Sequence, residues 1–139
     1  MYIAIIADDT KKELMTQFCI AYLGILSRHN LCATQTTGKH ISDSTGLDIE
    51  LLLPGDIGGI EQIASRISCN EIDVLLYFRD PSSEVDYESL VGRVTRLCDI
   101  HNVPVATNIA TAEALVLSLD SGILDWRELV NPNSKYNRK

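Results

Sequence analysis

The chain has 139 residues, 45% of them hydrophobic and 22% charged, with a formal net charge of −7 at pH 7; this is the profile of one globular domain. The negative charge disfavours nucleic acid as a partner, because phosphate backbones attract basic surfaces. No apolar run approaches the roughly 20 residues that a membrane span needs, and the start MYIAIIADD lacks the basic residues of a signal peptide.

Short apolar runs alternate with segments of helical spacing along the chain. The expected strands are 2–7, 31–35, about 47–53, 72–78 and 103–108. The expected helices are 11–29, a short one within 36–46, about 60–68, 85–102 and 111–122, the last with Gly122 as its C-cap. This alternation predicts right-handed crossovers and a doubly wound α/β domain with a parallel sheet. We expect the domain to span residues 1–131 and residues 132–139 to form a flexible tail.

The four cysteines are widely spaced and form no CxxC pair: Cys19, Cys32, Cys69 and Cys98. Each lies in an apolar context, which favours buried, reduced thiols over a disulfide or a zinc site. No histidine has metal-ligand spacing to a second histidine or to a cysteine. We therefore expect a cytoplasmic protein without a bound metal.

Polar clusters follow the expected strands directly: ADDTKK, ATQTTG, PGDIGG, RDP and ATN. The carboxyl ends of parallel strands lie at one edge of a sheet, and doubly wound proteins bind ligands there. The clusters therefore predict a ligand site at that edge.

Several of these residues are suited to binding a phosphate. Hydroxyls, backbone donors and one lysine could together supply charge-assisted hydrogen bonds and helix-end dipoles. The predicted phosphate-binding residues are Lys12, Thr34, Thr36, Thr37, Gly55, Gly58 and Gly59. Taken alone, Thr-Thr-Gly is also an ordinary helix cap. A phosphorylated small molecule or a nucleotide is the expected ligand.

Three carboxylates, Asp8, Asp9 and Asp80, also lie at strand ends. Next to Lys12, Asp8 and Asp9 are candidates for a role around the ligand. For Asp80, a structural role as a cap or as a hydrogen-bonded link between loops is an equal alternative.

The ordered set ADDTKK, ATQTTGKHISDSTG, PGDIGG, IDVLLYFRDP and NVPVATNIATAEALV resembles methylglyoxal synthase from about Tyr2 to Trp126. The resemblance implies a Rossmann-like parallel sheet of five strands and a homohexamer with sites near subunit boundaries. It also implies proton abstraction from dihydroxyacetone phosphate, after which the enediolate expels phosphate and leaves methylglyoxal. The family uses no cofactor and no metal.

The resemblance carries the family's phosphate-binding positions onto Lys12, onto Thr34, Thr36 and Thr37, and onto Gly55. Asp9 and Asp80 match two acids of the family site. Pro54 and Asp56 replace the serine and proline that flank the glycine in the family turn.

The positions that move protons in the family have changed. Where the family turn reads GGDQQ, with the aspartate as catalytic base, this chain reads GGIEQ, so Ile60 occupies the position of the base. Tyr87 aligns with a proton-shuttling histidine, Leu90 with its acidic neighbour, and Asp8 with a second histidine.

These replacements allow three hypotheses. The first is a relative that binds a phosphorylated ligand or nucleotide for sensing, regulation or sequestration, without efficient chemistry. The second is an active synthase with relocated groups, in which Asp8 or Glu61 is the base and Tyr87 donates a hydrogen bond to the enediolate. The third is a structural subunit that joins mixed hexamers with an authentic synthase.

Overall fold

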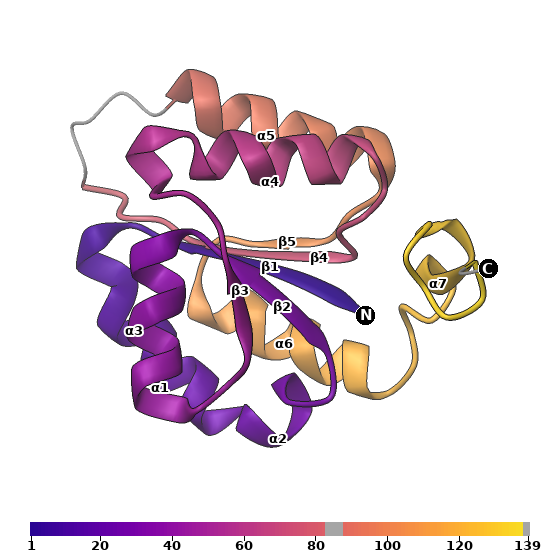
Figure 1. Ribbon diagram of the computed structural model, residues 1–139, viewed down its shortest axis with the longest axis horizontal. Coiled ribbons are helices and arrows are strands. Elements are labelled where there is room, and N and C mark those ends of the chain that lie inside the picture. Colours follow the sequence, from indigo (N-terminus) through magenta and orange to yellow (C-terminus); the bar gives the residue numbers. More distant parts are fainter. Residues whose placement is uncertain (83–87, 138–139) are drawn as a thin grey trace.

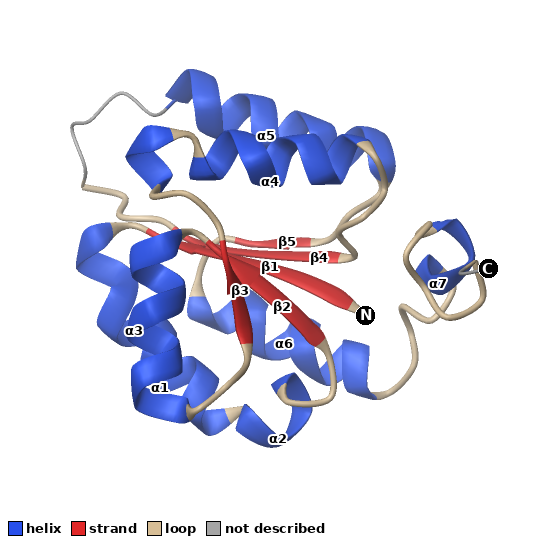
Figure 2. Ribbon diagram, in the orientation of Figure 1, coloured by secondary structure: helices blue, strands red, loops and turns tan. Residues whose placement is uncertain are grey.

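The computed structural model describes residues 1–82 and 88–137. Its centre is a five-stranded parallel sheet with the strand order β3-β2-β1-β4-β5, which confirms the predicted fold class (Figures 1 and 2). The strands are β1 (Tyr2–Ala7), β2 (Asn30–Ala33), β3 (Ile49–Leu51), β4 (Val74–Phe78) and β5 (Val105–Ala106). The order reverses between β1 and β4, and such a switch point is where ligands enter doubly wound sheets.

Helices cover both faces of the sheet (Figure 1). One face carries α4 (Gly59–Ser68) and α5 (Glu88–His101). The other carries α1 (Lys12–Ala21), α3 (Gln35–Thr45) and α6 (Ile109–Asp120), with the short α2 (Leu23–Leu26) below them. Two short 3₁₀ turns, η1 (Asp9–Lys11) and η2 (Gly55–Ile57), follow the ends of β1 and β3, and α7 (Arg127–Val130) lies near the C-terminus.

The core has one layer on each face of the sheet because the strands alternate their side chains. Ile5 and Phe78 face α1 and α6, and Ile6 and Tyr77 face α4 and α5. All five residues of β4 are buried, which explains the continuous apolar run in the sequence. The described residues contain no helix long and apolar enough to cross a bilayer.

Several element boundaries differ from the prediction. The segment expected as one helix over 11–29 is divided at Tyr22, the C-cap of α1. The polar segment 36–46 holds a full helix, α3, because its small buried face packs on the sheet. Gly122, expected as a C-cap, follows the C-cap Ser121 with φ of 88°. Residues 85–87 of the predicted fourth helix lie outside the described residues.

The C-terminal segment is attached to the domain through a buried ion pair. The Arg127 side chain is fully buried and donates from Nε to Oδ1 of Asp73 at 3.3 Å. It also donates to the carbonyl oxygens of His101 and Ile72. Beyond α7, Ser134 is buried and donates to the Glu128 carbonyl oxygen. Within residues 132–139, predicted as a flexible tail, Asn133, Ser134 and Asn137 make hydrogen bonds to residues outside that segment.

All four cysteines are free. Cys19, Cys32 and Cys98 are buried as expected, and burial raises the pKa of the Cys19 and Cys98 thiols to about 12. Cys69 is exposed, which corrects the expectation of a fourth buried thiol. It follows the last residue of α4, where the chain turns towards the solvent.

Candidate functional site

A cavity of about 420 Å³ lies outside the carboxyl ends of β1, β2 and β4, at the switch point of the sheet. It brings together seven of the residues predicted from the sequence: Asp8, Asp9, Lys12, Thr34, Thr36, Gly55 and Asp80. The remaining wall is formed by Ile6, Ala7, Thr10, Pro54, Asp56, Ile60 and Tyr77. Four of the five strand-end clusters therefore contribute to one cavity, whereas ATN (106–108) does not line it.

One part of the cavity has the donors that a phosphate requires. The helix α3 begins after Thr34, whose side chain makes no capping hydrogen bond to the first turn. The positive end of the helix dipole and the hydroxyl of Thr36 are therefore available at the cavity wall. Lys12 adds an ammonium group, and its side chain is only 18% exposed. Its Nζ donates to the Ala7 carbonyl oxygen at 3.3 Å and to Oδ1 of Asp9.

Three of the predicted phosphate-binding residues do not line the cavity: Thr37, Gly58 and Gly59. Thr37 is 1% exposed, and its hydroxyl donates to the Ala7 carbonyl oxygen at 3.4 Å. Gly58 has φ of 103°, and a Cβ on Gly59 would lie 2.0 Å from the Leu53 carbonyl oxygen. These two glycines are therefore required by the turn itself.

Of the other two predicted catalytic residues, one lies away from the cavity and one is not described. Glu61 is exposed and does not line it, because the next position along α4 turns away from Ile60 by about 100°. Tyr87 lies outside the described residues.

Asp80 is held by three hydrogen bonds. Oδ2 accepts from the Thr10 hydroxyl at 2.7 Å, and Oδ1 accepts from the Ser82 hydroxyl at 2.6 Å and from its backbone N–H at 2.9 Å. The hydroxyl of Ser82, then that of Thr10, holds the pKa of the Asp80 carboxyl below its ordinary value. Asp80 therefore remains ionised beside the cavity at neutral pH.

Asp8 links the ends of the two central strands. Its backbone N–H donates to the Phe78 carbonyl oxygen at 2.9 Å, and its Oδ2 accepts from the backbone N–H of Asp80 at 2.7 Å. Asp9 lies one residue further on, where its side chain is 98% exposed and paired with Lys12. The three aspartates thus occupy three different environments within one cavity.

The apolar wall was predicted only in part: the resemblance placed Ile60 at the position of the family base, whereas Tyr77 was not expected in the site. Ile60 is 5% exposed and Tyr77 is 1% exposed, and both also belong to the core layer under α4 and α5. Thr10 was not among the predicted site residues, yet its hydroxyl donates to Asp80. The sequence signal for Thr10 was its place in ADDTKK; no pattern indicated that Tyr77 would reach the cavity. Among the described residues, no group of acids, histidines and cysteines is placed to hold a metal ion.

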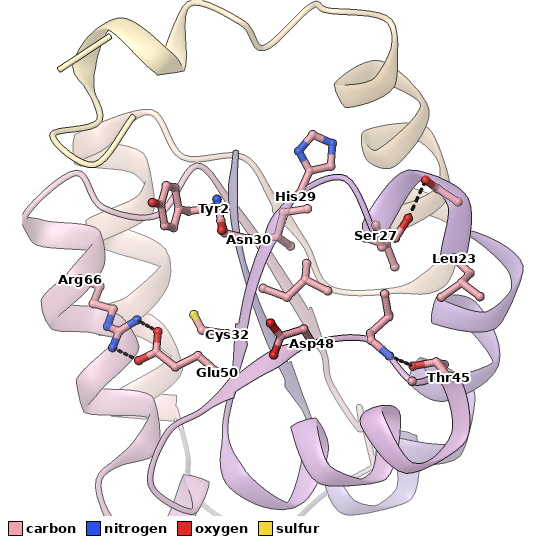
Figure 3. Close-up of a pocket in the computed structure, with 16 residues that line it drawn as sticks. Tyr2, Leu23, Ser27, His29, Asn30, Cys32, Thr45, Asp48, Glu50 and Arg66 are labelled. Atoms are coloured by element: carbon pink, nitrogen blue, oxygen red, sulfur yellow. Dashed lines mark hydrogen bonds and ion pairs between the residues drawn. The ribbon is translucent and has the colours of Figure 1, made fainter. Parts of the chain in front are cut away.

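A larger cavity of about 800 Å³ lies at the amino ends of β1, β2 and β3 (Figure 3). Its basic side chain Arg66 donates two hydrogen bonds to the carboxylate of Glu50, and Asp48 adds another negative charge. The Nδ1 atom of His29 lies 3.0 Å from the α-amino group of Met1, and burial lowers the pKa of its imidazole. With its arginine already paired, this cavity is poorly suited to a phosphate.

The fold and the first cavity define an α/β domain with a cavity at the switch point of a doubly wound sheet, lined by a lysine, threonines and carboxylates. Residues 15–107 match the family described as MGS-like domain. The chain is 54% identical over 138 residues to the methylglyoxal synthase of Caldicellulosiruptor saccharolyticus, covering 99% of this chain and 98% of that protein. It is 48% identical over 129 residues to the methylglyoxal synthase of Listeria welshimeri, covering 93% and 96%.

Comparison with a solved structure indicates the same family. The crystal structure of methylglyoxal synthase from Elizabethkingia anophelis matches with a TM-score of 0.74 and 34% identity, covering 83% of this chain and 76% of that chain. The chain belongs to the methylglyoxal synthase family, as the resemblance implied.

Proposed function

We propose that this protein is a methylglyoxal synthase that converts dihydroxyacetone phosphate into methylglyoxal and phosphate in the cavity at the switch point. Two relatives of nearly equal length carry this name at 54% and 48% identity. Identity over the whole length favours a shared activity over the binding-only role.

The observation that carries the proposal is the meeting of cation, helix N-terminus and carboxylates in one cavity. Lys12 and the first turn of α3 offer donors for the phosphate of the substrate. Asp8 and Asp80 lie at the ends of β1 and β4 on the same cavity. A phosphorylated ketose bound there would have its phosphate near Lys12 and its carbon chain near carboxylates.

The reaction can be written with the carboxylates that line the cavity. A carboxylate takes a proton from the hydroxymethyl carbon, and the electron pair of that C–H bond forms the double bond of an enediolate. The hydroxyl on the same carbon then loses its proton and becomes the aldehyde carbonyl, and the double bond shifts towards the carbon that carries the phosphate. The C–O bond breaks, and phosphate leaves with the bonding pair and takes up the hydroxyl proton. The resulting enolate takes at its terminal carbon the proton that the carboxylic acid holds, which gives methylglyoxal and restores the carboxylate. Atoms and charge balance without water, oxidant or reductant.

A second candidate function is favoured by Ile60. This aliphatic side chain lines the cavity where the family has its base, so a relative that binds the phosphorylated ligand without turnover is the alternative. The same phosphate donors would serve that role.

Incubation of the purified protein with dihydroxyacetone phosphate separates the two functions. Methylglyoxal and free phosphate are followed together, with heat-denatured protein as the control. Equimolar formation of both products supports the synthase. Saturable binding of phosphate with no product above the control supports the binding role. Size-exclusion chromatography with light scattering tests the predicted homohexamer in the same preparation.

A further inference from the structure

We propose that Asp8 is the general base that replaces the missing base at Ile60, an inference that rests on the proposed synthase function. The carboxylates of the described residues that line the cavity are Asp8, Asp9, Asp56 and Asp80. Their hydrogen bonds and exposure distinguish them.

Asp80 is poorly suited to act as the base. Its two oxygens accept three hydrogen bonds, and these lower its pKa. A carboxylate with a lowered pKa gains less by accepting a proton, so it is a poorer general base. The Asp80 carboxylate is better suited to a structural role, because it holds the hydroxyls of Thr10 and Ser82 and the backbone N–H of Ser82 in place.

Asp9 and Asp56 are not positioned for the task either. The Asp9 side chain is 98% exposed, and its Oδ1 is bound by Lys12. Taking up a proton would break the ion pair between Asp9 and Lys12. Asp56 is exposed and directly follows Gly55, on the side of the cavity expected to hold the phosphate.

Asp8 differs from all three because it is fixed in position and still has a free oxygen. Its backbone is bonded to the end of β4, and its Oδ2 accepts the backbone N–H of Asp80 at 2.7 Å. Its other oxygen, Oδ1, accepts no hydrogen bond from the described residues. The side chain is half-buried on the cavity wall, which limits its hydration.

Lys12 is placed to bind the phosphate of the substrate in the cavity that Asp8 also lines. The Lys12 ammonium donates to the carbonyl oxygen of Ala7, the residue that precedes Asp8. Lys12 and Asp8 line the same cavity, and the three-carbon chain of a substrate whose phosphate is bound by Lys12 is short enough to keep its hydroxymethyl carbon within that cavity. Oδ1 of Asp8 then receives the proton, and the C–H electron pair remains in the enediolate.

The test compares the wild type with Asp8→Asn, Asp8→Glu and the matched surface variant Asp43→Asn. The asparagine oxygen can still accept the Asp80 N–H, so the link between the strand ends is retained. Three quantities are measured: turnover of dihydroxyacetone phosphate, exchange of its hydroxymethyl protons with D₂O by proton NMR, and the Kd of inorganic phosphate.

The expected result is a loss of turnover and of proton exchange by about 10²–10⁴-fold in Asp8→Asn, with the phosphate Kd unchanged. Asp8→Glu retains part of the activity, because a carboxylate is still present, and Asp43→Asn behaves as the wild type. Loss of phosphate affinity together with turnover in Asp8→Asn would assign Asp8 a structural role and overturn the inference.

Two further outcomes separate this inference from the proposed function. An active wild type with an equally active Asp8→Asn overturns Asp8 as the base and leaves the synthase function standing. A wild type that binds phosphate but neither turns over nor exchanges protons overturns both.

Discussion

The Thr10 hydroxyl donates a 2.7 Å hydrogen bond to Oδ2 of Asp80, a residue 70 positions further along the chain. The contact connects the turn after β1 with the turn after β4, on the two sides of the switch point. It also helps to hold the pKa of Asp80 below its ordinary value.

This contact predicts how acid affects the fold. Because the pKa of Asp80 is lower in the folded chain than in the unfolded chain, the ionised carboxylate stabilises the fold at pH values above its unfolded pKa of about 3.9. That stabilisation is lost as the pH falls through the lower, folded pKa. Thr10→Val should therefore raise the Asp80 pKa and make the fold less resistant to acid. Carbon-13 NMR titration of the carboxyl group measures the shift; an unmoved titration curve would contradict it.

Lys12→Met should weaken phosphate binding. A charge-assisted hydrogen bond contributes about 1.5–3 kcal/mol, so the Kd of inorganic phosphate should rise by about 10-fold or more. Lys39→Met is the control, because Lys39 is exposed on α3 and does not line the cavity. Isothermal titration calorimetry measures both variants. Equal phosphate Kd values for Lys12→Met and Lys39→Met would show that the anion does not bind at Lys12.

Ile60→Asp should increase turnover. It places a carboxylate on the cavity wall in the first turn of α4, where the helix dipole favours negative charge. A positioned base contributes about 10²–10⁴-fold in rate. The kcat of Ile60→Asp is compared with that of Ile60→Asn, which has a similar shape and no base. A kcat that rises equally in both variants would attribute the gain to shape or to solvent access.

Gly59→Ala should destabilise the fold. The added Cβ would lie 2.0 Å from the Leu53 carbonyl oxygen and 2.9 Å from that of Pro54, and these backbone atoms cannot move aside cheaply. Overpacking of this kind costs about 1–3 kcal/mol. Gly24→Ala is the matched control, because nothing lies within 4 Å of its Cβ. Urea unfolding measures both; a Gly59→Ala protein as stable as wild type would show that the turn relaxes.

Arg127→Met should cost about 3–5 kcal/mol in the free energy of unfolding, because it leaves the buried carboxylate of Asp73 without its ion pair. The double variant Arg127→Met, Asp73→Asn should recover part of that loss. A double-mutant cycle by thermal unfolding measures the coupling. Additive losses would mean that the two residues act independently.

The sequence by itself determined the class of fold and the edge of the sheet that holds the site. Apolar runs such as 72–78 indicate buried parallel strands because both faces of those strands are covered. The polar clusters after the strands meet at one edge because parallel strands all end there. Lys12, Thr36, Asp8 and Asp80 could therefore be assigned to one site before any contact was known.

Which of those residues remain available to a ligand depends on contacts that only the folded structure shows. Thr37 and Gly59 follow the same patterns as Thr36 and Gly55, yet the fold commits them to backbone contacts. The three aspartates look alike in sequence and differ in their hydrogen-bond partners, which come from segments about 70 residues away for Asp8 and Asp80. Local periodicity sets which face a side chain occupies, whereas basicity depends on neighbours that long-range packing supplies.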